Sequence, residues 1–529
     1  MLAWMQELPV PIIAFAGISL LWGLWYSYNR PRKFPYPPGP NPLLIVGNWF
    51  DLPKDRDYEA YAQWGRDQGS DIVHARSFGH SVVVLNSYKA ATELLEKRSS
   101  IYSDRPHFVM LHEMLEYFGT GSHPYGNGWR KHRKAYRRHM DPGAITKYCY
   151  PQMVATQKLL TGLLDSPQDY INHIRYVTSE LMMGITYGME LQGNFEKYVA
   201  LSMDQTKIFL TAVRPGQFLV DSIPWLKYAP SWVPGTGFKA WAKESKERIK
   251  MAKSLPFNDT KKLLASGNAR PSFVLDSLHD IGNTDEINED VRVIKDVAGS
   301  TFSAGADTTT ATLEWFFLAL VLYPGVQKKA QEEIDKVIGQ GRLPQFEDRP
   351  DLPYVDAFVK ELYRYFVVTP VALPHYTTED DIYEGYYIPA KSTVLGNSWA
   401  MMHDPEEYSE PFKFQPERFL LKEGKPPRDP LIGGAFGFGR RICPGRHLAD
   451  ASIFLMVASV LALFNITPRQ DEKGDETDVS YALKALPGFF CRPPFFPFEV
   501  KPRSGSALSL VQEFISDGPT QSSPSLNPL

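Results

Sequence analysis

A single cysteine stands at the start of a predicted helix, inside a stretch rich in glycine. Cys443 is preceded by Phe436 and Gly439 and followed by Gly445 and an apolar run to residue 463. The positive end of a helix dipole and free backbone N–H groups stabilise a thiolate at such a place, and glycines let the backbone approach a flat ligand closely. The sequence therefore predicts a thiolate with a chemical role at Cys443.

The other two cysteines, Cys149 and Cys491, lie far from Cys443 in the sequence. Zinc and iron–sulfur sites need several cysteines close together, whereas a haem iron takes a single thiolate. A haem iron is thus the metal that Cys443 fits best. We interpret Cys149 and Cys491 as small buried hydrophobic residues, because an odd and sparse set of three is no disulfide framework.

A second stretch with chemical potential lies inside the longest helical pattern, residues 290–323. Ala304, Gly305 and Ala306 are followed there by the acid Asp307 and the hydroxyl of Thr308. Glycine is unfavourable in a helix interior by about 1 kcal/mol relative to alanine, and a threonine hydroxyl can bond to the carbonyl four residues back. We expect the helix to be distorted here, and close helix packing is the alternative explanation of the small residues.

The remaining elements are mostly helical. Helical periodicity continues at residues 326–338 and 354–365, and strand-like alternation occurs at residues 80–85 and 381–395. Glu361 and Arg364 are three residues apart on one face of a predicted helix, where a guanidinium can hold a carboxylate, although such a pair is more often an exposed surface contact. No repeat or long linker interrupts residues 45–503. These patterns predict one large, mainly α domain with a minor β portion.

Composition agrees with a folded chain. Of the 529 residues, 43% are hydrophobic and 22% charged, which is too apolar for intrinsic disorder. The net charge of −3 argues against nucleic acid as a partner.

The N-terminus predicts a membrane anchor. Residues 8–28 carry no charge and would span roughly 30 Å as a helix, about one bilayer core. Arg30, Arg32 and Lys33 follow at once, so the positive-inside rule puts the rest of the chain in the cytosol. We divide the chain into an anchor at 1–29, a basic, proline-rich hinge at 30–44, the large domain at 45–503 and a disordered tail at 504–529. A cleavable signal peptide is the competing interpretation, but a basic n-region and a small-residue cleavage site are missing. In the cytosol, the glycosylation sequons at Asn258 and Asn465 would be false positives.

The stretch around Cys443 resembles the haem-binding loop of the cytochrome P450 family, Phe-x-x-Gly-x-Arg-x-Cys-x-Gly. Phe436, Gly439, Arg441, Cys443 and Gly445 match it without a departure. The resemblance implies the cytochrome P450 fold from residue 35 to about 500, and haem b as the cofactor. It also implies that Cys443 is the axial ligand of the iron, that Arg441 pairs with a haem propionate, and that Phe436 packs beside the sulfur.

Further motifs of the family follow in the expected order. Trp129 and Arg133 look like its haem-propionate motif, and His375 stands where the family often has another propionate donor. Arg418 matches the partner segment of Glu361 and Arg364, which implies a buried Glu–Arg–Arg triad that holds the region of the Cys443 loop. Residues 304–309 resemble the oxygen-activation motif, in which Thr308 would hydrogen-bond dioxygen and Asp307 would help to relay protons.

The resemblance implies a membrane-anchored haem-thiolate monooxygenase of the endoplasmic reticulum, with its catalytic domain in the cytosol. One atom of O2 would enter a small organic substrate, with electrons from NADPH through the flavins of NADPH-cytochrome P450 reductase. The basic residues between 130 and 138 would receive this acidic flavoprotein. A haem-thiolate isomerase or dehydratase, and a non-enzymatic haem-based sensor, are the alternatives; dependence of turnover on NADPH would separate them.

Within the family, residues 64–67, 94–103 and 377–381 look like fungal members of secondary metabolism, the group of O-methylsterigmatocystin oxidoreductase and tryptamine 4-monooxygenase. By family position the substrate pocket is lined from residues 102–121, 208–219, 302–308, 369–373 and 486–490. These segments are rich in aromatic and aliphatic residues and hold few charges. We therefore expect an apolar substrate, terpenoid or polyketide-derived, that binds mainly by burial.

Overall fold

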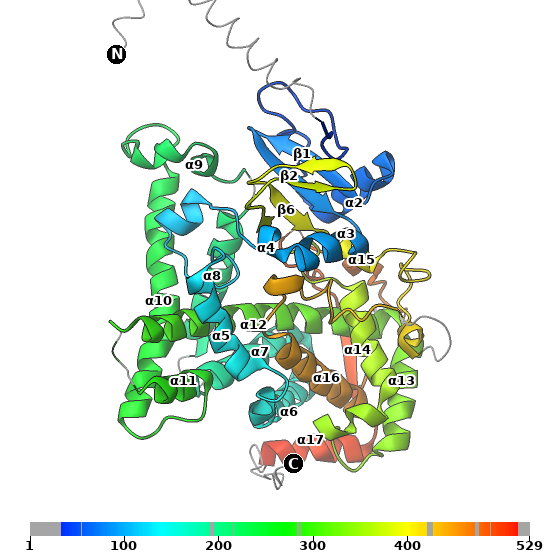
Figure 1. The fold of residues 1–529 in the computed structure, drawn as a ribbon. Helices are drawn as coiled ribbons and strands as arrows, with labels where there is room; N and C mark the ends of the chain where they lie inside the picture. Colours follow the sequence, from blue (N-terminus) through cyan, green and yellow to red (C-terminus); the bar gives the residue numbers. More distant parts are fainter. Residues whose placement is uncertain are drawn as a thin grey trace, which may run out of the picture.

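The computed structural model describes residues 33–516, apart from residues 54, 191–194, 215, 283–284, 286, 421–426, 471–474 and 487. Helices make up most of this part of the chain, and short strands form small sheets. The largest sheet lies at the upper end of the molecule (Figure 1). The prediction of a mainly α domain with a minor β portion is confirmed. The predicted anchor at 1–29 lies outside the described residues.

The helices are, in chain order, α2 (Asp57–Gln68), α3 (Tyr88–Ala91), α4 (Ser99–Tyr102), α5 (Asn127–Met140), α6 (Cys149–Asp165), α7 (Tyr170–Tyr187), α8 (Phe195–Ala212), α9 (Leu219–Ser222), α10 (Phe238–Ala265), α11 (Phe273–Ile281), α12 (Glu289–Leu322), α13 (Pro324–Val337), α14 (Pro353–Tyr365), α15 (Ser398–Met402), α16 (Arg446–Leu463) and α17 (Gly505–Ser516). Four short turns of other helical types matter below: η3 (Val109–Met114), η6 (Pro224–Tyr228), η8 (Pro416–Leu420) and η9 (Gly439–Arg441).

The largest sheet has the strand order β1-β2-β6-β3. β1 (Ile72–Ser77) and β2 (His80–Leu85) are antiparallel, β6 (Thr393–Gly396) is parallel to β2, and β3 (His375–Tyr376) is antiparallel to β6. β4 (Asp381–Tyr383) pairs with β5 (Tyr386–Ile388), and β7 (Phe464–Pro468) pairs with β8 (Phe498–Pro502). The predicted strand at 80–85 is β2, and the alternation at 381–395 corresponds to β4, β5 and the first part of β6.

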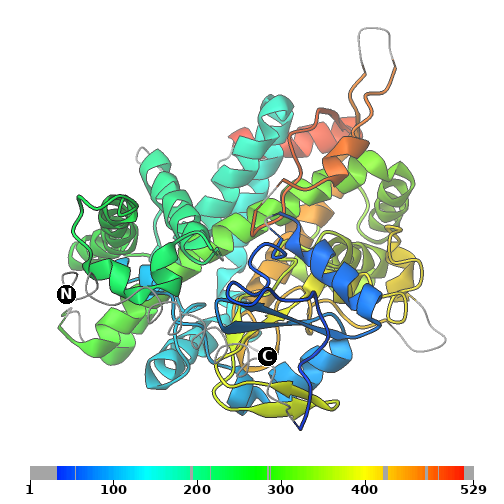
Figure 2. The ribbon, with the colours of Figure 1, turned by 90° about the horizontal axis from the view of Figure 1, so that it is seen from above.

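Helix α12 runs through the middle of the molecule (Figures 1 and 2). The Asn288 side chain accepts the N–H of Asp290 at its start, and Glu289 and Asp290 place negative charge in its first turn. The helix ends before Pro324, since the residue before a proline disfavours helical geometry. Most of its side chains beyond the first turns are buried, except that Ala304 is exposed and Asp307 and Thr308 are half-buried, so this helix organises the core around it.

The predicted distortion of α12 at residues 304–309 is not present. The Thr308 hydroxyl donates to the carbonyl of Ala304 at 2.8 Å, as expected, but α-helical structure continues without a break. Close packing, the alternative explanation, accounts for Gly305, because a Cβ there would lie 2.5 Å from the terminal methyl of Met182 on α7. Ala304 is exposed, so close packing does not explain the whole run.

The main hydrophobic core lies among α6, α7, α12, α14 and α16. Within the described ranges, α16 has the length and apolar composition to cross a membrane, but 72% of it is buried in the domain, and α12 with α13 passes the same test only as a pair bent by 102°. Both features are those of core helices. A smaller cluster, formed by residues 109–118, 208–220 and α10, stands apart from this core.

Both ends of the domain pack against the rest of it. In the hinge, the carbonyl of Pro38 accepts the N–H of His74 and Tyr36 stacks on the His74 ring, so residues 35–40 lie against the large sheet. In the tail, α17 forms where disorder was predicted, because Ala507 and Val511 are one turn apart and bury against the main core. Residues 517–529 lie outside the described part of the chain.

Candidate active site

Cys443 lies in the loop between η9 and α16 and is half-buried. Its backbone N–H donates to the carbonyl of Phe436 at 2.8 Å, which folds the loop back on itself. Gly439 adopts a φ of +52°, and a Cβ there would lie 2.2 Å from the carbonyl oxygen of Leu95. A side chain at this position would therefore displace the loop, which explains the requirement for glycine at 439.

The environment of Cys443 does not by itself favour a thiolate. Burial raises the pKa of the Cys443 thiol, while the N–H groups of Gly445 and Arg446 and the guanidinium of Arg133 act in the opposite direction. The start of a helix is thus insufficient to ionise the thiol against desolvation. A bound metal ion would supply the missing positive charge, since a coordinating thiol is deprotonated.

Trp129 and Arg133 of α5 lie beside the Cys443 loop. Arg133 Nη1 donates to the carbonyl of Ile442 at 2.9 Å. The guanidinium groups of Arg133 and Arg441 lie over the Trp129 ring, 5.9 and 4.8 Å from its centroid. Burial lowers the pKa of Arg441 to about 10 and also lowers that of Arg133. The structure thus brings three of the predicted residues into one cationic, aromatic cluster.

A further arginine, which the sequence analysis missed, joins this cluster. Arg105 is buried, with Nε donating to the carbonyl of Gly121 at 2.7 Å and Nη1 to the carbonyls of Leu373 and Pro374 at 2.7 and 2.6 Å. Burial and the neighbouring charge of Arg441 lower its pKa well below the usual value. No periodic pattern marks Arg105, because its acceptors stand 16 to 269 residues away.

These three guanidinium groups fit a dicarboxylate ligand. Among the described residues, no carboxylate forms an ion pair with Arg105, Arg133 or Arg441, and Arg441 Nη1 is buried without a hydrogen-bond partner. Buried charges need partners, and the two propionates of a haem would provide them. An added Cβ at Gly445, two residues after Cys443, would meet no protein atom within 4 Å, so open space remains at this glycine. The residues therefore fit a haem with Cys443 at its iron.

His375 also lies at this cluster, on β3. It is buried, and its Nδ1 lies 2.7 Å from the carbonyl oxygen of Tyr102. Burial, and then the charge of Arg105, lower its pKa well below the usual value. The ring is therefore neutral, and a Nδ1–H that donates to Tyr102 leaves Nε2 as an acceptor. A carboxylate facing Nε2 would raise the pKa of His375 and restore a second donor, as the predicted propionate role requires.

Asp307 and Thr308 lie on α12, where Asp307 pairs with Arg492 and the Thr308 hydroxyl donates to the carbonyl of Ala304. The Asp307 carboxylate accepts from Arg492 Nη2 at 3.0 Å, and Arg492 Nη1 lies 3.4 Å from Glu314 Oε1. Burial raises the pKa of Glu314, and the Arg492 charge opposes the rise. Arg492 stands 185 residues from Asp307 in a proline-rich segment, and nothing in its local sequence indicates the pairing. The predicted proton-relay acid is thus held by an arginine that the sequence analysis did not identify.

A small cavity lies beside Arg105. Its lining comes from three of the five predicted pocket segments or their immediate continuations: Arg105, Pro106, Phe108, Leu111, Gly121, Ser122, Phe209, Val213, Leu373 and Pro374. Ala306 and Asp307 line a different, small cavity with residues of α7 and α8. No residue of the segment 486–490 is among the described residues that line either cavity.

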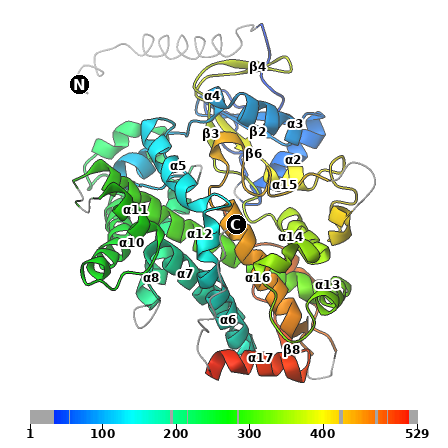
Figure 3. The same cartoon turned by 60° about the horizontal axis from the view of Figure 1, so that its bottom comes forward.

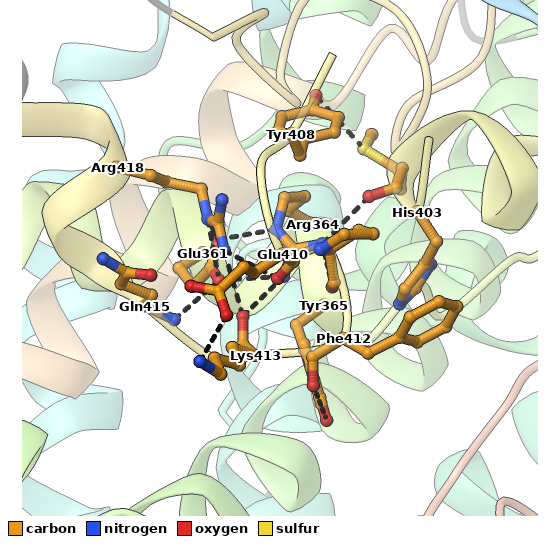
Figure 4. Close-up of polar contacts among 12 residues, drawn as sticks. Glu361, Arg364, Tyr365, His403, Tyr408, Glu410, Phe412, Lys413, Gln415 and Arg418 are labelled. Carbon is orange, nitrogen blue, oxygen red and sulfur yellow. Dashed lines mark hydrogen bonds and ion pairs between the residues drawn. The ribbon is translucent and has the colours of Figure 1, made fainter. Parts of the chain in front are cut away.

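The predicted triad of Glu361, Arg364 and Arg418 is present and buried (Figure 4). Glu361 accepts from Arg364 Nε at 2.7 Å and Nη2 at 2.8 Å, and its carboxylate lies 3.1 Å from Arg418 Nε. The remaining donors of Arg364 reach the carbonyls of Met402 and Pro411. The triad therefore joins α14 and η8 to the loop between α15 and η8, which leads toward the Cys443 loop.

Helix α12 packs against both α5 and α16 in the middle of the molecule (Figures 1 and 3). A sequence profile of the cytochrome P450 family matches residues 37–492. The chain is 40% identical to cytochrome P450 monooxygenase ple1 of Rhodocybe pseudopiperita, over 96% of this chain and 97% of that protein. It is 38% identical to cytochrome P450 monooxygenase 98 of Postia placenta, over 90% and 92% of the two chains, and 36% identical to tryptamine 4-monooxygenase of Psilocybe cyanescens, over 94% and 99%.

The chain belongs to the cytochrome P450 family and is a monooxygenase, an oxidoreductase whose cofactor is haem b. When bound, the haem supplies the iron that activates O2, with electrons that come from NADPH through a redox partner. The described residues would hold it through Cys443 at the iron and through Arg105, Arg133, Arg441 and His375 at the propionates. The Asp307 carboxylate on α12 is paired with Arg492.

Proposed function

We propose that the substrate is an apolar or modestly polar natural-product skeleton, terpenoid or polyketide-derived, which the enzyme hydroxylates or oxidises further at carbon. The observation that carries this proposal is the lining of the cavity beside Arg105, where Phe108, Leu111, Phe209, Val213 and Leu373 present apolar surface. Burial of such surface contributes roughly 25 cal/mol per Å². Such a step belongs in the biosynthesis of a fungal secondary metabolite.

The charge of the cavity supports an uncharged substrate. Among its described lining residues, Arg105 is the charged one and none is an acid. A buried ammonium group would therefore have no counter-charge, and its desolvation would be unfavourable. One relative is named for tryptamine, an amine, and we expect tryptamine to be a poor substrate here.

The test is expression of the full chain with a fungal NADPH-cytochrome P450 reductase and a screen of terpenoids and aromatic polyketides. Supporting results are a substrate-induced shift of the Soret band and an oxygenated product that requires NADPH. Leu111→Ala should weaken binding of the hit, because Leu111 is buried at the cavity, while Leu483→Ala at an exposed position should not. Turnover of tryptamine or other charged metabolites alone, with every apolar compound inactive, would contradict the proposal.

We propose NADPH-cytochrome P450 reductase as the redox partner, docking on the basic face of α5. Arg130, Lys134 and Arg137 are exposed there, and Arg440 is exposed on the adjoining Cys443 loop. Lys134 and Arg137 form no ion pair among the described residues, which leaves their charge available to an acidic flavoprotein. Lys134→Glu with Arg137→Glu should slow reduction of the haem at low salt, and Lys328→Glu on α13 is the matched control.

We also propose that the protein is held in the endoplasmic reticulum membrane by residues 1–29, with the catalytic domain in the cytosol. Exposed apolar side chains support a lipid-facing end: Leu43, Leu44, Ile45, Phe50, Phe78, Leu219, Trp225, Tyr228 and Trp232. The two stretches adjoin, because a Cβ on Gly216 would lie 2.5 Å from the Trp49 ring. A contiguous apolar patch of this kind favours a membrane surface.

Protease added to intact microsomes tests this topology. It should digest the domain, and detergent should make no further difference. Protection of residues 45–503, or a glycan on Asn258 or Asn465, would reverse the proposed orientation.

A further inference from the structure

Two chain segments cover the cavity beside Arg105, and we call them the roof. The first is residues 108–118, which contain η3, and the second is residues 208–214 and 218–228, which contain α9 and η6. Phe108 and Leu111 line the cavity from the first segment, and Phe209 and Val213 line it from the second. In Figure 1, α9 lies at the upper left, above α8 and at the end of α10. A molecule that enters the cavity from this side has to part the two segments.

The roof has its own hydrophobic cluster, separate from the main core. Buried members include Met110 and Leu115 from the first segment and Ile208 and Val220 from the second, packed with residues of α10. Because η3, α9 and η6 contact mainly one another, α8 and α10, the two segments can separate without unfolding the main core. The contacts between the segments then determine how readily the roof opens.

Three polar contacts join the first segment to the second segment and to α10. The Met110 N–H donates to Asp221 Oδ1 at 2.9 Å, Lys227 Nζ lies 2.5 Å from Glu113 Oε2, and Lys246 Nζ lies 2.6 Å from Glu116 Oε1. The two ion pairs involve exposed carboxylates, with side-chain exposures of 37% for Glu113 and 66% for Glu116. Water and salt screen such pairs strongly. The hydrogen bond to Asp221 is the shielded contact.

The Asp221 carboxylate accepts a hydrogen bond from a backbone N–H group at the start of η3. Met110 is in the first turn of η3, where N–H groups lack partners within the turn, and no side chain of the first segment caps it. Asp221 is half-buried, and burial raises its pKa to about 6, while the N–H groups of Met110 and Val109 oppose the rise. A hydrogen bond from backbone N–H to a carboxylate in a place with little water is strong and directional. This hydrogen bond joins the two roof segments through Met110 and Asp221, which are 111 residues apart in the sequence.

We propose that Asp221 is a positioning residue that fastens the two roof segments over the cavity, and so controls how fast a substrate-sized molecule reaches the active site. This inference rests on the proposed substrate cavity, but not on the identity of the substrate. An amide oxygen at position 221 can accept the same Met110 N–H, whereas a methyl group cannot. Asn should therefore retain the closed roof and Ala should not.

The experiment uses the full, haem-loaded protein in detergent and two nitrogen ligands of different size, imidazole and clotrimazole. Stopped-flow measurement of the Soret shift gives the association rate of each ligand. Asp221→Ala should raise the rate for clotrimazole at least fivefold and leave the rate for imidazole within twofold. Asp221→Asn should stay within twofold of wild type for both ligands. Asp221→Ser, whose hydroxyl is too short to reach Met110, is a second test variant with the expectation of Asp221→Ala.

Hydrogen exchange of the amides of residues 109–115 gives a second readout in the same samples. It should accelerate in Asp221→Ala and Asp221→Ser, but not in Asp221→Asn or in the control Lys227→Met, which removes the ion pair with Glu113. Unchanged clotrimazole rates in the Ala and Ser variants would overturn the proposal. So would equal acceleration of both ligands, or an Asn variant as fast as the Ala variant. None of these results depends on whether a terpenoid or polyketide is the substrate.

Discussion

Replacement of Glu361 by glutamine tests the buried triad most directly. The side chain keeps its shape, but Arg364 and Arg418, whose side chains are 0% and 6% exposed, lose the only carboxylate that pairs with them in the described structure. Loss of one partner from a buried ion pair costs about 3–5 kcal/mol, because the remaining charge stays desolvated. The carbonyl acceptors of Arg364 at Met402 and Pro411 remain, so the lower half of this range is the better expectation.

The expected shift in melting temperature follows from the length of the chain. An unfolding entropy of about 2.1 cal/mol/K per residue gives about 1.1 kcal/mol/K for 529 residues. A loss of about 3–4 kcal/mol therefore lowers the melting temperature by about 3–4 °C. The red-shifted Soret band of the reduced carbon monoxide complex should disappear at the same temperature, since the triad holds the region of the Cys443 loop.

The measurement is thermal unfolding of the full chain in detergent, followed by circular dichroism and by that Soret band. Glu244→Gln is the matched control: it makes the same chemical change in an exposed pair with Arg248 on α10 and should leave the melting temperature unchanged. Equal melting temperatures for wild type and Glu361→Gln would refute the argument that the pair is buried and uncompensated.

Three other substitutions have definite expected outcomes. Cys443→Ser should abolish the red-shifted Soret band of the reduced carbon monoxide complex; survival of the band would refute the assignment of the axial ligand. Thr308→Ala should bind haem normally and divert NADPH electrons into peroxide or water, measured as NADPH and peroxide per product; tight coupling would remove Thr308 from the mechanism. Burial lowers the pKa of His132 to about 4, so the unfolded chain binds a proton near pH 6.5 that the folded chain does not. The stability that comes from the neutral ring is complete above about pH 6.5 and is lost as the pH falls toward 4, by roughly 3 kcal/mol. His132→Gln should flatten this part of the stability profile, and an unchanged slope in urea unfolding would argue against a neutral buried ring.

Regular elements could be predicted closely from the sequence, because their signals are local. The helical pattern at 290–323 corresponds to α12 within one residue at each end, and the alternation at 80–85 is β2. The prediction of a disordered tail was wrong at α17, because the signal for this helix is not local. Polar and proline-rich residues near the end of the chain outweighed a short apolar repeat at Ala507 and Val511. That repeat is stable only because the main core receives it, and the sequence of the segment does not show this contact.

The site could be predicted only where residue type and spacing carry the chemistry. Cys443 and its glycines stand within ten residues, so their pattern is visible in the sequence. Arg105 and Arg492 are not visible, because their function depends on acceptors that the fold brings from far along the chain. The pKa of Cys443 shows the same limit, since the position before α16 predicts ionisation while burial opposes it.

The two missed arginines differ in a way that explains how the site is organised. Arg492 lies between Asp307 and Glu314, so the acids on that part of α12 have a cationic partner before any ligand binds. Arg105 donates to carbonyls and lies near Arg441, whose Nη1 has no hydrogen-bond partner. Asp104 is an acid whose charge acts on both guanidinium groups, so the two buried cations are only partly compensated. Uncompensated buried charge destabilises the fold, and a ligand that brings carboxylates reduces this penalty. Binding of the dianionic cofactor and completion of the fold are therefore coupled at Arg105 and Arg441, whereas the acid on α12 is already positioned by the protein alone.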